Sequence, residues 1–312
     1  MKKPDFIRKT LVLQYFHPLL LLAMLCLSGC YDNDGVFSDQ LIDHKPYKFF
    51  VAGHTYGHPV EAVDSVGLFP QFYRKLPAIA ADKSIEFGVF TGDLVKYNEG
   101  FRYDSVVNQL ARYNLEVYKV PGNHDTGVGR FYGNWHRYFG TSWYSFRRHS
   151  DLYLFLDPNL NYWQITDPQL EMIRTELQDL AQVNNIFVFH HQILWWDSSP
   201  DSLLHYTNPN SPEGRLDSLV NFWTDVIPMF RPLKQQVYFF AGDAGAWCWL
   251  RSMTYYQEEN IHLLTSGMGC VKTANYLEVS VDESKKVSIR IVALGEDGEG
   301  ALGTIWDHRL SR

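Results

Sequence analysis

The sequence predicts an α/β domain built from layers of sheet and helix. Three observations support this class. Apolar runs with the character of strands alternate with helical patterns, and each run ends in a polar turn. The composition of the 312 residues, 46% apolar and 20% charged, is that of a globular protein with a substantial core. No convincing linker follows residue 46, so we expect one domain over residues 47–312.

The predicted elements alternate along the chain. Strands are expected at Tyr47–Ala52, Phe87–Thr91, Glu116–Val120, Leu152–Leu156, Ile186–Phe189 and Val237–Ala241. Helical patterns lie between several of them, at Leu68–Ala81, Tyr103–Tyr113 and Asp167–Ala181. The last is the clearest helix, with Asp167 as its expected cap and Pro168 in its first position. A further meander is predicted at Ile261–Thr265, Tyr276–Val281 and Val287–Val292.

The amino-terminal segment, residues 1–29, has the order of a secretory signal. A basic stretch is followed by the apolar run Pro18–Leu27. Leu27-Ser28-Gly29-Cys30 then resembles a bacterial lipoprotein cleavage box, which implies that Cys30 becomes the first, lipidated residue. An uncleaved membrane anchor is the alternative, although the apolar run is short for a span. We therefore expect a lipoprotein signal peptide at 1–29, a polar tether at 30–46 and a lipid-anchored domain in the bacterial cell envelope.

Charge argues against a nucleic-acid partner. The whole chain carries −7 and its first 29 residues carry +3, which leaves −10 for the remainder. Such an acidic protein lacks the basic surface that nucleic-acid phosphates require. Once Cys26 is removed and Cys30 is lipidated, Cys248 and Cys270 remain. They could pair in an oxidising envelope, but their spacing alone does not establish a disulfide.

Polar clusters follow five of the predicted strands. They are Gly53-His54-Thr55-Tyr56-Gly57-His58, Gly92-Asp93, Gly122-Asn123-His124-Asp125, His190-His191 and Gly242-Asp243. The carboxyl ends of adjacent strands share one crevice in an open α/β sheet, and ligands bind there. Asp, Asn and His donors suit Mn, Fe, Zn or Mg. Each cluster alone could be the start of a loop, but their common position favours one site.

The order of these motifs resembles the calcineurin-like metallophosphoesterase superfamily. That family reads Asp-x-His, Gly-Asp, Gly-Asn-His-Asp or Glu, a strand-end His, and Gly-His-x-His, and the resemblance covers about residues 47–292. It implies a four-layer αββα sandwich of two mixed β-sheets flanked by helices. It also implies two metal ions and the hydrolysis of phosphoesters by a metal-activated hydroxide.

The resemblance assigns roles to individual residues. Asp93 would bridge the metals, and Asn123 and His190 would bind the second metal. His191 is interpreted as a neighbour, since the family ligand is the first His of such a pair. His124 would face the scissile phosphate as proton donor or charge stabiliser, oriented by Asp125.

The chain departs from the family at the first and last motifs. This chain has His54-Thr55-Tyr56 where the family has Asp-x-His. It has Gly242-Asp243-Ala244-Gly245 where the family has Gly-His-x-His. The first-metal set is then poor, with His54, Tyr56, the shared Asp93 and nothing at Gly245. The second set, Asp93, Asn123, His190 and Asp243, has four acceptable donors. We expect one or two divalent ions of Mn, Fe or Zn, and these two donor sets support one ion better than two. His54 stays a candidate ligand because an imidazole and a carboxylate have exchanged places between the two motifs.

Several neighbouring residues keep two interpretations. Lys96 could partly replace a missing ion's charge or be a solvated loop lysine. Aromatic residues of the predicted cleft loops could stack on a sugar, a nucleobase or another planar group, or could pack beneath the loops. These residues are Phe131, Tyr132, Trp135, Tyr138, Trp195, Trp196, Trp247 and Trp249.

Two functions follow from these patterns. The first is a membrane-anchored, metal-dependent phosphoesterase that hydrolyses a phosphomonoester or phosphodiester of a small molecule, glycan or lipid at a non-standard site. The alternative is a catalytically inactive binding or assembly lipoprotein of the cell envelope with the same fold. A repair nuclease of this superfamily is disfavoured by the export signal and the acidity.

Overall fold

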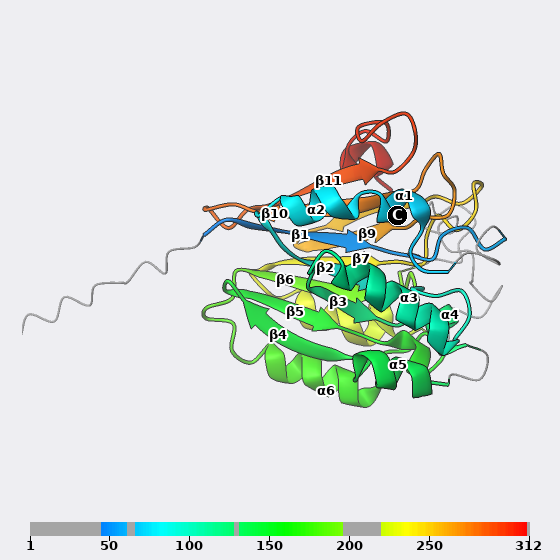
Figure 1. Ribbon diagram of the computed structural model, residues 1–312. Coiled ribbons are helices and arrows are strands. Elements are labelled where there is room, and N and C mark those ends of the chain that lie inside the picture. Colours follow the sequence, from blue (N-terminus) through cyan, green and yellow to red (C-terminus); the bar gives the residue numbers. More distant parts are fainter. Residues whose placement is uncertain (1–44, 61–65, 128–130, 196–219, 311–312) are drawn as a thin grey trace, which may run out of the picture. The chain divides into compact units, whose positions relative to one another are not determined.

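Two mixed β-sheets pack face to face at the centre of the domain (Figure 1). The computed structural model describes residues 45–60, 66–127, 131–195 and 220–310, which belong to the unit Asp43–Arg312. The predicted signal peptide, the lipidation site Cys30, the tether up to residue 44 and Trp196 lie outside the described residues.

The first sheet has the strand order β11-β10-β1-β2-β3. Its strands are β1 (Tyr47–Ala52), β2 (Ile85–Thr91), β3 (Val117–Val120), β10 (Asn275–Val281) and β11 (Val287–Ala293). β1, β2 and β3 run parallel, whereas β10 and β11 pair antiparallel. The carboxyl ends of three parallel strands therefore point to one edge of this sheet.

The second sheet has the order β4-β5-β6-β7-β9-β8. Its strands are β4 (Tyr144–Arg148), β5 (Asp151–Phe155), β6 (Asn185–His190), β7 (Gln236–Ala241), β8 (Met253–Glu258) and β9 (Ile261–Ser266). β5, β6, β7 and β9 run parallel, and antiparallel β4 and β8 close the two edges. Antiparallel edge strands on a parallel core are common in sheets of this class.

Aromatic side chains fill the space between the sheets. Alternate residues of each strand point inward, among them Phe49 of β1 and Phe187 of β6, whose ring centroids lie 5.1 Å apart. Each such ring, fully buried, stabilises the fold by roughly 1.5–3 kcal/mol through removal of apolar surface from water. The intervening residues point outward to the helices.

Helices cover both outer faces (Figure 1). On the first sheet, α1 (Pro70–Tyr73), α2 (Leu76–Ala81) and α3 (Gly100–Ala111) share a core with Trp135 of α5 (Gly133–Phe139). On the second sheet lie α6 (Asp167–Glu176), the π-helical turn η4 (Phe222–Val226) and α8 (Ile227–Phe230). The remaining short turns are α4 (Asn123–Thr126), η2 (Pro158–Leu160) and η5 (Ile305–His308). The predicted α/β class, a four-layer αββα sandwich, is confirmed.

Two helix predictions differ in detail from the structure. The helix expected over Leu68–Ala81 is split into α1 and α2, because Pro70 and Pro77 each mark a separate helix start. The cap of α6 is Thr166 rather than Asp167, which is the first helical residue. Among the described residues, no helix combines the length and the apolar character needed to cross a bilayer.

Candidate active site

The loops after β1, β2, β6 and β7 meet at one edge of the sandwich. The backbone N–H of His54 donates to the carbonyl of Gly92, and the N–H of Asp243 donates to the carbonyl of His191. His54 and Asp93 both have left-handed backbones, with φ of 53° and 56°. Each such conformation costs on the order of 1–3 kcal/mol and is characteristic of functional sites. The sequence therefore brings its predicted strand-end clusters from both sheets into contact.

Four polar donors converge at this edge. The Nε2 atom of His191 lies 3.1 Å from Asn123 Oδ1, 3.4 Å from Asp93 Oδ1 and 3.9 Å from Asp243 Oδ1. His191, Asp93 and Asp243 are almost completely buried, whereas Asn123 is exposed. The four side chains come from the ends of four different strands, so the fold itself assembles them.

His191 is held as a cation beside a carboxylate. Its Nδ1–H donates to the carbonyl of Thr91 at 2.9 Å. Burial alone would lower the pKa of His191, but the Asp93 carboxylate outweighs it and raises the pKa to about 10. Burial would raise the pKa of Asp93, yet His191 and His124 hold it below its usual range. In this state the Nε2–H of His191 donates to Asn123 Oδ1.

The expectation that His190 rather than His191 joins the site is wrong. The Nδ1–H of His190 donates to the carbonyl of Gln192 at 2.6 Å, and its ring packs against Trp195, Phe222 and Phe239. Burial lowers the pKa of His190 to about 3, so the ring is neutral. The reason is strand alternation, since His190 points to the helix side of β6 and His191 points to the space between the sheets.

His54 contacts the other oxygen of Asp93. Its Nδ1–H donates to the carbonyl of Met268 at 3.0 Å, and its Nε2 lies 3.4 Å from Asp93 Oδ2. Burial lowers the pKa of His54 to about 4, which leaves Nε2 with a free lone pair. Asp93 Oδ2 accepts no hydrogen bond from the described residues. Two electron-pair donors thus face each other at this contact.

His124 is oriented by groups other than the predicted one. Its Nδ1–H donates to the carbonyl of Lys96 at 2.7 Å, and its Nε2 lies 3.3 Å from the Tyr56 hydroxyl. Burial, with Asp93 and Asp243 nearby, holds the pKa of Tyr56 well above its usual value, so the hydroxyl keeps its proton. Tyr56 therefore packs in the site as a hydrogen-bonding aromatic residue.

Asp125 organises the backbone rather than His124. Its carboxylate accepts hydrogen bonds from the N–H groups of Gly122, Leu94 and Val95 at 2.8, 2.9 and 3.1 Å. Burial and the Asp93 charge raise the pKa of Asp125 to about 7. These contacts correct the expectation that Asp125 orients His124, because they join the β2 loop to the start of α4. A side chain at Gly122 would collide with Asp93, since its Cβ would lie 2.1 Å from Asp93 Oδ1.

The loop after β7 turns at Gly245 in a left-handed backbone conformation. This residue has φ of +72°, and a Cβ there would lie 2.6 Å from the Cβ of Ser252. A histidine cannot occupy this backbone without moving it. The loop is held to the segment after β9 by the Cys248–Cys270 disulfide and by the hydrogen bond from Cys270 N–H to the carbonyl of Gly245. The structure thus pairs the two cysteines whose pairing the sequence left open.

The donor set fits one metal ion better than two. Among the described residues, no group of three or more His, Cys, Asp or Glu side chains forms a ready-made metal site. With Asn123 added, however, His191 Nε2 lies 3.1, 3.4 and 3.9 Å from an oxygen of Asn123, Asp93 and Asp243, respectively. Ligand bonds of about 2.1 Å place neighbouring donors roughly 3.0–3.4 Å apart around one ion. A divalent ion would replace the Nε2 proton of His191, while the His54 side offers too few donors for a second.

Only some of the aromatic residues predicted for the cleft loops are exposed. Trp135 and Trp195 are fully buried and pack under the loops. Phe131 and Trp249 are strongly exposed, and Trp247 packs edge-to-face on His58 with ring centroids 5.0 Å apart. Lys96, open to two interpretations from sequence, is buried and donates to the carbonyl of Pro59. The hydrogen bond from His124 to the backbone carbonyl of Lys96 could not be predicted from the sequence, because every residue has such a carbonyl.

Comparisons with known proteins agree with the fold. A family model for calcineurin-like phosphoesterases matches residues 44–244, well over half of the chain. A search of curated proteins gives no match. Among solved structures, purple acid phosphatase PPD1 from yellow lupin (Lupinus luteus) superposes with a TM-score of 0.57 at 11% identity. The match covers 82% of this chain and 52% of the lupin chain, so this chain corresponds to about half of that enzyme.

Two further structures match with lower TM-scores. A conserved uncharacterized protein of Streptococcus pneumoniae, a predicted phosphoesterase, has a TM-score of 0.34 and 11% identity over 81% of this chain and 92% of its own. Vps29 from Entamoeba histolytica in complex with zinc has a TM-score of 0.33 and 9% identity over 80% and 99% of the two chains. The family model, together with the two-sheet fold, confirms the resemblance drawn from the motifs. This chain belongs to the calcineurin-like phosphoesterase family.

Proposed function

We propose that this protein is a metal-dependent phosphoesterase that acts on a phosphomonoester or phosphodiester with a single divalent ion. The ion would be held by Asp93, Asn123, His191 and Asp243, with His191 taking the place first assigned to His190. The proposal rests on the convergence of His191 Nε2 with three side-chain oxygens at one buried edge. Nitrogen and oxygen donors of these types suit Mn, Fe or Zn.

Different residues would bind the metal ion and transfer the proton. A divalent ion in this site would supply positive charge that polarises a phosphoryl oxygen. The hydrogen bond from His191 Nδ1–H to Thr91 fixes which nitrogen faces the ion. His124, fixed by Lys96 on one side and Tyr56 on the other, would donate a proton to the phosphoryl group or stabilise its charge.

Metal reconstitution tests this function directly. The full-length protein should bind about one equivalent of Mn, Fe or Zn per chain and then hydrolyse a generic aryl phosphate. Metal content would be measured by elemental analysis after gel filtration, and hydrolysis by release of the coloured phenol. A well-folded protein that takes up none of the three metals would overturn the proposal.

A non-catalytic binding or assembly role is the second candidate. It is favoured by the backbone at Gly245, which excludes the family histidine, and by the lack of a ready-made metal cluster among the residues that the structure describes. In this case alanine at Asp93 and at His124 should leave the cellular role of the protein intact. Loss of that role in both stably folded variants would exclude this candidate.

We further propose that the protein is a lipoprotein of the bacterial cell envelope. The signal-like residues 1–29 support this location, and the Cys248–Cys270 disulfide suits an oxidising compartment. Wild-type protein made in bacteria should incorporate labelled palmitate and fractionate with membranes, whereas Cys30→Ser should do neither. Equal labelling of both forms would contradict lipidation at Cys30, and membrane association without label would indicate an uncleaved anchor.

A further inference from the structure

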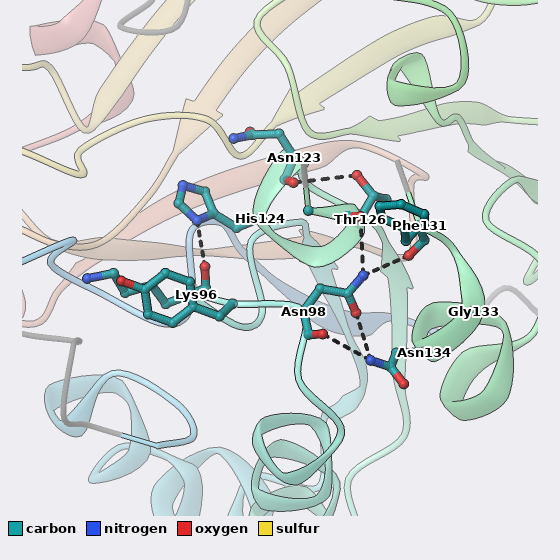
Figure 2. Close-up of a pocket in the computed structure, with 10 residues that line it drawn as sticks. Lys96, Asn98, Asn123, His124, Thr126, Phe131, Gly133 and Asn134 are labelled. Atoms are coloured by element: carbon teal, nitrogen blue, oxygen red, sulfur yellow. Dashed lines mark hydrogen bonds between the residues drawn. The ribbon is translucent and has the colours of Figure 1, made fainter. Parts of the chain in front are cut away.

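A cavity of about 710 Å³ is lined in part by Asn123, one of the candidate ligands (Figure 2). Its near wall is formed by Asn123 and His124 of α4. Its far wall comes from the loop before α3, the end of α4, the residues after it and the start of α5. The described residues of that wall are Lys96, Tyr97, Asn98, Thr126, Gly127, Phe131, Gly133 and Asn134. This volume lies in the range of sites that enclose an organic ligand of moderate size.

The position of the cavity links it to the reaction. Asn123 is both a candidate ligand of the ion and a lining residue, and His124 lines the cavity on the same helical turn. A phosphoryl group held at Asp93 would therefore extend its ester substituent past His124 into this space. The cavity then receives the organic part of the substrate.

Side-chain amides hydrogen-bond the elements of the far wall to one another. Asn98 Nδ2 donates to the carbonyls of Thr126 and Phe131 at 3.2 and 2.7 Å, and Asn134 Nδ2 donates to the carbonyl and to Oδ1 of Asn98, both at 3.0 Å (Figure 2). Because these amide N–H groups are used inside the wall, they are not offered to a polyhydroxylated ligand such as a glycan.

Two of the described lining residues present exposed aromatic rings to a ligand. The side chain of Phe131 is 70% exposed and that of Tyr97 is 44% exposed, although both are large rings. The Lys96 ammonium lies 5.1 Å from the centroid of the Tyr97 ring and is tied to the carbonyl of Pro59. The described lining residues include no carboxylate. Such exposed rings favour a planar ring as the ligand.

We propose that this cavity selects phosphoesters whose alcohol carries an aromatic or heteroaromatic ring, which stacks on Phe131 and Tyr97. This inference rests on the proposed phosphoesterase function, since the cavity is assigned the ester substituent. It narrows the substrate class from small molecule, glycan or lipid to a ring-bearing small molecule, such as an aryl or nucleoside phosphate.

The test compares two non-hydrolysable probes, phenylphosphonate and methylphosphonate, on the full-length protein with and without Mn²⁺. Calorimetry should give about ten-fold tighter binding of phenylphosphonate, as expected for a ring that stacks on one or two aromatic side chains. Phe131→Ala and Tyr97→Ala should each reduce this preference. The matched control is Phe101→Ala, because Phe101 is 54% exposed but does not line the cavity.

The outcomes separate the two proposals. Equal affinity for the two phosphonates, no binding of either, or an unchanged preference in both cavity variants would overturn the cavity assignment, even if aryl phosphates are hydrolysed. A preference for phenylphosphonate that Phe131→Ala removes and Phe101→Ala keeps would support it. If that preference is found in a protein that hydrolyses no phosphoester, the phosphoesterase function fails while the ring-binding cavity stands.

Discussion

Replacing His191 with Asn should abolish tight metal binding, whereas the same change at His190 should leave it nearly intact. An Asn amide can still donate to the carbonyl of Thr91, as the Nδ1–H of His191 does, but it has no atom in the place of Nε2. Outer contacts of a metal site are typically worth about 10- to 100-fold in affinity, so loss of a direct ligand should cost at least about 100-fold. Calorimetric titration with Mn²⁺ would measure both variants.

Stability provides the control for this pair. Removal of one partner from a buried ion pair costs about 3–5 kcal/mol, so His191→Asn should also destabilise the metal-free protein. His190→Asn should lose stability too, because the ring packs against Trp195, Phe222 and Phe239. Both variants must therefore be shown to be folded by circular dichroism at the titration temperature. Metal binding retained in folded His191→Asn and lost in folded His190→Asn would reverse the assignment made from the geometry.

Replacing Asp125 with Ala should produce the largest loss of stability in the site. Three buried N–H groups, those of Gly122, Leu94 and Val95, would lose their acceptor. At about 1–3 kcal/mol for each of the three unsatisfied buried groups, we expect a decrease of roughly 3–9 kcal/mol in the free energy of unfolding, measured by urea denaturation. Asp125→Asn should cost less, because its amide oxygen can still accept from Leu94 and Val95.

The same Asn variant distinguishes a structural from a catalytic role. A carboxylate that orients a catalytic imidazole can cost about 10⁴-fold in kcat when it is replaced by an amide. Here His124 is oriented by Lys96 and Tyr56. Folded Asp125→Asn should therefore keep its kcat on an aryl phosphate within about 100-fold of wild type, the loss that a misplacement of about 1 Å can cause. A loss of several orders of magnitude in a variant of near-normal stability would restore the role that the sequence suggested for Asp125.

Much of the fold was predictable because its signals are local. The parallel strands are short apolar runs that end in polar turns, and these boundaries can be read directly from the chain. β4 and β8 were not predicted, because Tyr144–Arg148 and Met253–Glu258 are edge strands with mixed polar and apolar residues. The apolar spacing of residues 68–81 predicts one helix, whereas Pro70 and Pro77 each mark the start of a separate one.

The choice between His190 and His191 could not be made from the sequence. Every residue of β6 is buried, since one face meets the other sheet and the opposite face meets the helices. Both faces are therefore apolar, and the alternation that usually reveals orientation is absent. Strand geometry predicts that the side chains of His190 and His191 point in opposite directions, but the sequence does not show which of them points toward the site. That information belongs to the packing of the two sheets.

The contacts of Asp125 were hidden for a different reason. Its partners are backbone N–H groups, which every residue except proline possesses, so no residue type in the β2 loop marks them. A carboxylate next to a histidine resembles a catalytic pair in the sequence. In the fold it holds together the two loops that carry Asp93 and Asn123.

The disulfide has a practical consequence for how the protein is made. Cys248 and Cys270 join the loop that carries Asp243 to the segment after β9, and a reducing cytosol would leave these sulfurs unpaired. Protein expressed there would lack the covalent tie beside a proposed ligand, and a lack of activity in it would say little about the disulfide-bonded protein. Preparations secreted into an oxidising compartment are the appropriate starting material.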